Sequence, residues 1–579
     1  KYMISSSLFD EQGIVKTAGY NRFNTRMNLN SQLFSWLNMT ANMVYTNEVR
    51  NIVPEGSNSI LKRALFQDPL VYTYDSKGYY SENHPIAALN RYHNKNEMHR
   101  LDVNLSLTAQ ITKQLTYQFK ISDYIVPERR SSFTEVAKLD EDFLMPTDLT
   151  TVYVRQNLTN KWEVNNLLTF TWNNDVHNLT LLGGQIIEGY KFSYQESTRK
   201  GTASNSPDLW FLSSAYTGDK TTGLDNEWAA VGFVGRINYN VLDRYLFQAN
   251  FRADASSVFE KKDRWGYFPS LSLGWKFSSE PFMQNAEWLT LGKLRVGWGQ
   301  LGNNRIDEMS RYTLLNTQYN YPFGIGNHTL YPGTTASSIG NKNIRWEKTE
   351  TYNVGLDLGF FRNSLTVGVE LFNKLTTDML LRVPVTLSAG LDYAPMSNAG
   401  SVRNQGAELT INHKNNIGKF KYEVGFNVSY IKNKVISLGT GNEPIYGGWL
   451  SEAGIVDFTT KTAVGLPIGS FYGYVTDGIF QSYEEVKVSA QYEYGKNDAD
   501  QLTRPGDFRF VDLNEDGRIT ADDRTIIGSP HPDFVFGIPL SCSYGNIDLN
   551  LFFQGQTGNK IFNVMDYYLN NAAEGNLYA

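Results

Sequence analysis

The most specific chemical motif in the sequence is a run of oxygen-bearing residues between Asp512 and Asp523. If Asp512 takes the first position, oxygen donors fall where a calcium-binding EF-hand loop has them, and Gly517 allows the sharp turn. The predicted ligands are Asp512, Asn514, Asp516, Arg518 through its carbonyl, Thr520 and Asp523. The last of these is Asp instead of the usual bidentate Glu, and the flanks are not helical. The spacing predicts a Ca²⁺ ion that stiffens the loop; the alternative is an Asx-rich turn without metal.

Aromatic side chains in irregular segments form a second set of candidates. A ring that faces solvent can stack on a sugar face or pack against peptide side chains. The candidate ligand-binding residues are Trp210, Phe211, Tyr446 and Trp449. The alternative is that these rings hold the loops to one another.

Catalytic motifs are missing from the sequence. It contains no GxSxG, HExxH or phosphate-cradling glycine motif. The single cysteine, Cys542, excludes a disulfide within the chain. The net charge of −6 and the pI near 5.8 give no support for nucleic-acid binding. We therefore predict neither an enzyme nor a nucleic-acid partner.

The elements that would position these residues are β-strands with two chemically different faces. In the segment from Glu227 to Phe277, apolar residues recur at every second position and polar residues fill the positions between them. This alternation places the apolar side chains of a strand on one side of a sheet. The strands are about ten residues long, which a tilted strand needs to cross a bilayer. The pattern predicts an all-β fold, a transmembrane antiparallel β-barrel that is apolar outside and polar inside.

Connection lengths predict which rim of the barrel faces the cell exterior. Short turns alternate with long irregular segments, as in outer-membrane barrels, where the long loops are external. The expected long connections are 51–95, 127–157, 201–226, 303–343, 376–402 and 438–532. Between them we count about 17 strands, an odd number that does not close a bacterial barrel of the usual even kind.

We expect one domain over residues 1–579, with a calcium-loop-like extracellular insertion at 506–530. Residue 1 already lies in a strand-like segment, and residues 570–579 form no closing strand. The sequence is therefore expected to be a piece of a longer protein, incomplete at both ends.

Three segments resemble the SusC/RagA family of TonB-dependent outer-membrane transporters. They are the run Gly340 to Asp357, the run Gly400 to Leu409, and the run from Gly506 to Pro530. The turn from Phe9 to Ile14 is similar to the first external hairpin of that family. Together these motifs span nearly the whole chain.

The resemblance implies a barrel of 22 strands when complete, an N-terminal plug and a TonB box, in the outer membrane of a Gram-negative bacterium. It implies a SusD-like surface lipoprotein as partner, oligosaccharides or peptides as substrates, and energy delivered through TonB. Contact with outer-membrane lipid and a dimer of transporter–lipoprotein pairs are further expectations. By this resemblance we expect the plug, the TonB box, the first strand and the last strands to lie outside this sequence.

Other functions remain open at this point. The barrel could be a passive porin, which lacks a TonB box, or part of a protein-secretion complex or a surface adhesin. A soluble lectin-like β protein is the least favoured alternative. Residues such as Phe247, Phe251 and Trp275 would then form an exposed apolar band larger than soluble proteins tolerate.

Overall fold

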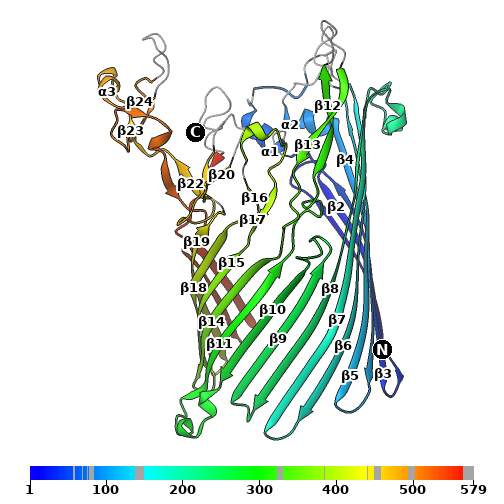
Figure 1. Cartoon of the computed structure of the whole chain (residues 1–579), viewed down its shortest axis with the longest axis vertical. Helices are drawn as coiled ribbons and strands as arrows, with labels where there is room; N and C mark the ends of the chain where they lie inside the picture. The colour runs from blue at the N-terminus through cyan, green and yellow to red at the C-terminus, as the bar shows by residue number, and fades with distance from the viewer. Residues whose placement is uncertain are drawn as a thin grey trace.

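The molecule is described by a computed structural model. The described residues are 1–55, 59–67, 70–74, 76, 84–136, 149–322, 330–383, 385–439, 441–448, 458–492 and 503–564. Within them, 17 strands form one antiparallel sheet, which we call the wall. Figure 1 shows the wall as a curved sheet of tilted strands. The predicted strand number and the β-barrel fold class are confirmed.

Strands of the wall pair in chain order, and β1 and β29 lie at its two ends among the described residues. The strands are β1 (Tyr2–Gln12), β2 (Gly19–Phe34), β3 (Leu37–Asn51), β4 (Tyr92–Gln110), β5 (Leu115–Thr134), β6 (Thr151–Asn173), β7 (His177–Lys200), β8 (Thr217–Val241), β9 (Tyr245–Ser256), β10 (Trp265–Trp275), β11 (Leu289–Asn303), β14 (Glu347–Phe360), β15 (Leu365–Thr377), β18 (Ser401–Ile417), β19 (Phe420–Ser437), β28 (Phe534–Tyr544) and β29 (Ile547–Thr557).

Strand register shows that the apolar side chains share one face of the wall. Phe247 pairs with Tyr239 on one side and with Leu273 on the other, and Leu273 pairs with Val296. Residues opposite each other in an antiparallel pair point to the same side of a sheet. The apolar positions therefore form a continuous band, which is the outward, lipid-facing side. The intervening polar positions line the inward side.

The two rims of the wall differ in how the strands are joined. On one rim most turns are tight. Leu242 and Asp243 both have positive φ, as the central residues of a type I′ turn do, and Gly418 and Gly545 turn the chain at the β18–β19 and β28–β29 hairpins. The longer connection 276–288 between β10 and β11 lies on the same rim. The opposite rim carries the long connections, which we call the crown: residues 52–91, 135–150, 201–216, 257–264, 304–346, 378–400 and 438–533. Figure 1 shows the tight turns at the bottom and the crown at the top.

The crown contains short helices and small sheets. Its helices are α1 (Ile60–Phe66), α2 (Pro85–Arg91) and α3 (Tyr483–Val488); its strands are β12 (Leu314–Pro322), β13 (Leu330–Ser338), β16 (Leu380–Arg382), β17 (Met396–Asn398), β20 (Ile445–Gly447), β21 (Thr460–Thr462), β22 (Ser470–Gly473), β23 (Thr476–Ile479), β24 (Gln491–Tyr492), β25 (Phe508–Phe510), β26 (Arg518–Ile519) and β27 (Thr525–Gly528). No helix among the described residues combines the length and apolar character needed to cross a membrane.

Strands β5, β6 and β8 are longer than the alternation predicts. Residues 127–134, 151–157 and 217–226 were expected in long connections, but they extend the wall beyond the apolar band. Most side chains of these extensions are polar, and apolar ones such as Phe133 and Val152 pack against Trp210 in the crown. A regular period-two signal of a half-buried strand is therefore absent there. The corresponding connections shrink to 135–150 and 201–216.

Small apolar cores hold the crown on the wall. The largest contains Val258, Phe259, Phe268, Ile344 and Trp346. Phe259 is fully buried, and the indole N–H of Trp346 donates to the Arg264 carbonyl at 2.9 Å. The Gly340 to Asp357 run of the family resemblance thus has a structural role, because Ile344 and Trp346 lock one connection onto its neighbour.

Candidate functional site

The inward face of the wall carries paired charges across several strands. Ion pairs join Arg155 to Glu196 at 3.5 Å, Lys161 to Glu188 at 3.4 Å and Arg252 to Asp254 at 2.8 Å. All six side chains come from inward positions, so a polar molecule inside the barrel would meet charges of both signs. Such a surface suits hydrogen-bonding solutes better than apolar ones.

The best-defined charge network lies on β11, β14 and β15. The Arg295 guanidinium donates from Nε to Asp357 at 2.7 Å and from Nη2 to the same carboxylate at 3.0 Å. Its Nη1 donates to Glu370 at 3.2 Å. Gly355 makes room for this fork, because a Cβ there would lie 2.7 Å from Arg295 Nη2. Bidentate pairing fixes the direction of the side chain as well as its charge.

Next to this network the inner wall has a shallow hollow of 450 Å³. Its inward lining is rich in amides from Asn178, Asn238, Asn240, Gln248 and Asn353, with Lys293 and Arg295 at one side. Amides both donate and accept hydrogen bonds. The hollow therefore matches hydroxyl-rich or peptide-like solutes equally well.

Trp210 is a predicted ligand-binding residue that lines a cavity. The cavity has a volume of 550 Å³ and includes His93 and Phe133 in its lining. The indole stacks on the His93 ring at 4.1 Å and on Phe133 at 5.1 Å, and it packs against the buried residues Val152 and Ala215. Trp210 therefore holds the crown together and also presents part of its ring to a cavity.

The other three aromatic candidates have different surroundings in the chain. Phe211 is half exposed beside it. Tyr446 packs against Phe458 and Tyr472 in a separate four-stranded sheet of the crown, with the Lys461 ammonium over its ring at 5.6 Å. Trp449 lies outside the described residues. Ligand binding by these rings stays a prediction.

The predicted calcium ligands form two groups within one loop. Asp512 accepts from the Gly517 N–H at 2.7 Å, and Asn514 donates to Asp516 at 3.0 Å, so these side chains meet at one turn. Thr520 begins a one-turn helix, η9 (Ala521–Asp523).

The fully buried Asp523 serves the backbone of the same loop. Its carboxylate accepts from the N–H groups of Leu513 at 2.8 Å and Thr520 at 2.7 Å. These backbone donors, Thr520 first, hold the pKa of Asp523 below its usual range. Among the described residues, no three His, Cys, Asp or Glu side chains converge on one metal position. Calcium binding stays a prediction.

A polar contact that the sequence did not reveal joins two connections of the crown. Asp392 accepts from the Tyr319 hydroxyl at 2.5 Å and from the Asn316 amide at 3.2 Å. The Tyr319 hydrogen bond is the main reason that the pKa of Asp392 lies below its usual range. Asp392 is more than 70 residues from Asn316 and Tyr319 in the sequence, and only tertiary structure brings it to the β12–β13 hairpin.

The inner-wall network was also missed by sequence reasoning. Alternation assigns Arg295, Asp357 and Glu370 to the inward face, but it does not say which of the many inward charges meet. Their contact depends on the register of β11, β14 and β15, which the turn lengths set. The available signal was the placement of all three at inward positions on successive strands.

The fold and the two-faced wall define a class of protein, the outer-membrane β-barrel with a polar interior. The chain belongs to the family described as TonB dependent receptor-like, beta-barrel, whose sequence profile matches residues 9–524. A TonB-dependent receptor of Formosa agariphila is 27% identical over 613 residues, which cover 99% of this chain and 56% of that protein. The TonB-dependent receptor SusC of Bacteroides thetaiotaomicron is 32% identical over 350 residues, 59% of this chain and 32% of SusC.

Solved structures agree on the fold. The structure of the RagAB peptide transporter matches with a TM-score of 0.78 at 22% identity, over 96% of this chain and 59% of that one. The RagAB peptide importer in its closed-closed state matches with a TM-score of 0.79 at 22% identity, over 96% of this chain and 60% of that one. This chain thus spans somewhat more than half the length of such relatives.

Proposed function

We propose that this chain forms the barrel of a SusC-like TonB-dependent transporter that imports oligosaccharides or peptides across the outer membrane. The observation that carries the proposal is the wall itself: apolar outside, charged and amide-lined inside, and surmounted by a large crown on one rim. The amide-lined hollow next to Arg295 suits the hydrogen-bonding groups of both substrate classes.

The proposal includes two partners and an energy source. A SusD-like surface lipoprotein would bind over the crown, and TonB would act through a segment outside this sequence. The likeness to SusC and to RagAB supports the lipoprotein partner. A dimer of transporter–lipoprotein pairs belongs to the same proposal.

A structural Ca²⁺ ion in the loop from Asp512 to Asp523 is part of the proposal. The donor set consists of carboxylate, amide, hydroxyl and carbonyl oxygens, which are the ligands that this ion prefers. Isothermal titration of the purified full-length protein with Ca²⁺ should give a heat that Asp512→Asn together with Asp516→Asn abolishes. No binding by the wild-type protein would contradict the ion.

The decisive experiment is gentle purification of the full-length protein from outer membranes, followed by mass spectrometry of the intact complex. We expect a lipoprotein in near-equal amount and bound oligosaccharide or peptide masses. Uptake of that ligand by cells should stop when the proton-motive force is collapsed. Uptake that continues would indicate a passive pore, and a barrel accompanied by secretion components without small ligand would overturn import.

A further inference from the structure

The outward face of β4 to β8 continues above the membrane as a polar surface. An apolar row crosses these strands in register, formed by Leu105, Ile121, Val164, Ile187 and Val231. Farther toward the crown a second row on the same outward face is polar. Its members are Glu97, Arg129, Gln156, Gln195 and Gly223.

The polar row lies where lipid headgroups begin. Gln156 and Val164 belong to the same strand and are about 26 Å apart along it, at about 3.3 Å per residue. Between them on the outward face lie Trp162, of the kind of aromatic residue found at membrane interfaces, and Leu158, the last apolar side chain below Gln156. The row is thus outside the hydrocarbon and beside the headgroup layer.

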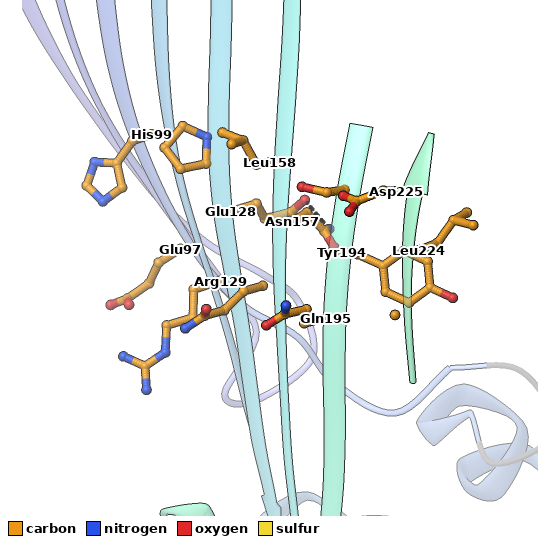
Figure 2. Close-up of a pocket in the computed structure, with 14 residues that line it drawn as sticks. Glu97, His99, Glu128, Arg129, Asn157, Leu158, Tyr194, Gln195, Leu224 and Asp225 are labelled. Atoms are coloured by element: carbon orange, nitrogen blue, oxygen red, sulfur yellow. Dashed lines mark hydrogen bonds between the residues drawn. The ribbon is translucent and has the colours of Figure 1, made fainter. Parts of the chain in front are cut away.

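A hollow of 710 Å³ opens along this polar row. Figure 2 shows its lining, with Glu97, His99 and Arg129 gathered at one side. Its outward side chains include Glu97, His99, Arg129, Gln156, Gln195 and Asp225. The volume is within the range of about 300–1,000 Å³ that is usual for small-molecule sites. Because these side chains point away from the barrel interior, a solute in transit does not meet them.

The lower end of the hollow meets the membrane interface. His99 Nδ1 is 2.9 Å from the hydroxyl of Tyr45, which lies on the outward face of β3. Tyr45 and Trp162 are the aromatic residues nearest this end of the hollow on their strands. A molecule anchored by acyl chains in the outer leaflet would therefore have its headgroup at this opening.

The cavity lined by Trp210 lies above the hollow along β4 and β5. Lys95 lines the Trp210 cavity, Glu97 lines the hollow, and their charged groups are paired at 2.5 Å. We call these two adjacent cavities the outward cleft, which follows β4 and β5 from the membrane interface toward the crown. Its upper end is aromatic, with the Trp210 indole stacked on His93.

We propose that this outward cleft binds the saccharide headgroup of an outer-leaflet glycolipid. Gln156, Gln195 and Asp225 offer the donors and acceptors that sugar hydroxyls require. Arg129 and Lys95 provide cations for phosphate or acidic sugars, and arginine forms bidentate bonds with such groups. The aromatic upper end suits the apolar face of a sugar ring. The inference uses the proposed function only in placing the chain in the outer membrane.

The test compares two variants of the full-length protein purified from outer membranes in mild detergent. Gln156→Ala with Gln195→Ala removes the central amides of the cleft. Gln405→Ala is the matched control, since Gln405 is exposed on the same outward face of a distant strand, β18. Bound glycolipid per protein is measured by mass spectrometry. We expect the control to equal the wild type and the double variant to lose about tenfold or more, as the removal of two hydrogen bonds predicts. Equal amounts in all three proteins would overturn the proposal.

Competition experiments separate the sources of the glycan. Deacylated lipopolysaccharide headgroup should displace bound lipopolysaccharide from the wild-type protein, whereas the neutral glucan maltoheptaose should not. Displacement by maltoheptaose would instead indicate a site for free glycans and overturn the lipid assignment. A change of oligomeric state in the double variant, by analytical ultracentrifugation, would instead indicate an interface between copies and also overturn it.

A measurement of nutrient uptake separates failure of this inference from failure of the proposed function. The double variant should retain wild-type uptake, because both amides lie on the lipid side of the wall. Loss of glycolipid with normal uptake supports the cleft, whatever the transported substrate is. Absence of uptake in the wild type would count against the proposed import but not against the glycolipid site.

Discussion

The wall and the crown are built in different ways. In the wall, every strand between β1 and β29 is paired on both sides, and side chains need only alternate between lipid and a polar interior. In the crown, the described segments depend on small apolar cores and individual polar contacts, such as those of Trp346 and Asp523. The wall therefore spreads its stability over many equivalent positions, whereas the crown concentrates it in a few.

This difference predicts where a substitution acts. A change in the wall should matter according to the face it occupies and its depth in the membrane. A change in the crown should matter according to the particular contact it removes, and it should leave the wall intact. The four predictions that follow test that distinction.

The largest effect is expected for Leu271→Arg on the outward face of β10, at a position well inside the apolar band. A cation there faces lipid, which costs about 2–4 kcal/mol near the bilayer midplane. Ser272→Arg, one residue away on the inward face, is the matched control and should be tolerated. Guanidinium unfolding in detergent or lipid vesicles, together with the yield of heat-modifiable barrel, measures both. Equal destabilisation by the two arginines would contradict the assignment of the faces.

In the crown, Asp523→Ala should release the loop without affecting the wall. The substitution leaves the buried N–H groups of Leu513 and Thr520 without acceptors, at a local cost of about 1–3 kcal/mol. Trypsin should then cleave faster at Arg518 and Arg524, while heat-modifiability stays unchanged. The exposed neighbour is the control, and Asp522→Ala should cleave at the wild-type rate. Unchanged cleavage in both variants would show that the loop is held by other contacts.

A smaller effect is expected for Arg295→Ala on the inner wall. It leaves Asp357 and Glu370 facing each other without their shared cation. All three side chains are about one-third exposed to the interior, so screening limits the loss to about 1 kcal/mol. Arg295→Lys keeps the charge but not the fork, and its unfolding midpoint should lie between those of wild type and alanine. If the lysine variant is as unstable as the alanine variant, the stabilisation comes from the bidentate geometry of the guanidinium and not from its charge.

The smallest effect is a pH dependence of the β12–β13 hairpin. Because the pKa of Asp392 is lowered by the Tyr319 hydrogen bond, its contribution is fully present above the unfolded value of about 3.9 and is lost as the pH falls through the folded value. Hydrogen exchange in β12 should therefore accelerate below about pH 3.9, after correction for intrinsic rates. Tyr319→Phe should weaken this dependence. An identical profile in the variant would remove Tyr319 as the cause.

Much of the wall was predictable because its physics is periodic. The alternation in β9 and β10 identified their faces, and the strand number followed from counting such segments. The extensions of β5, β6 and β8 were not predicted, because above the lipid neither face of a strand needs a regular row of apolar residues. Ladder hydrogen bonds keep these segments extended, and a sequence pattern does not record backbone pairing.

The crown was far less predictable. Its candidate residues were chosen by type, yet what they do depends on neighbours distant in sequence, as Trp210 with His93 and Phe133 shows. The loop from Asp512 to Asp523 was identified from spacing alone, but not that Asp523 is buried and bonded to the loop backbone. Tertiary contacts of this kind leave no period in a sequence.

The strict alternation along each wall strand also constrains how such a protein can change over generations. Inserting one residue into β7 would exchange the lipid-facing and interior side chains of everything beyond it. Wall strands can thus lengthen or shorten only in pairs of residues, or with a bulge that absorbs the odd one. A crown connection such as residues 438–533 can gain or lose any number of residues without exchanging the two faces of a wall strand. Diversification by insertion and deletion is therefore expected to accumulate at one rim, where new ligands are first met.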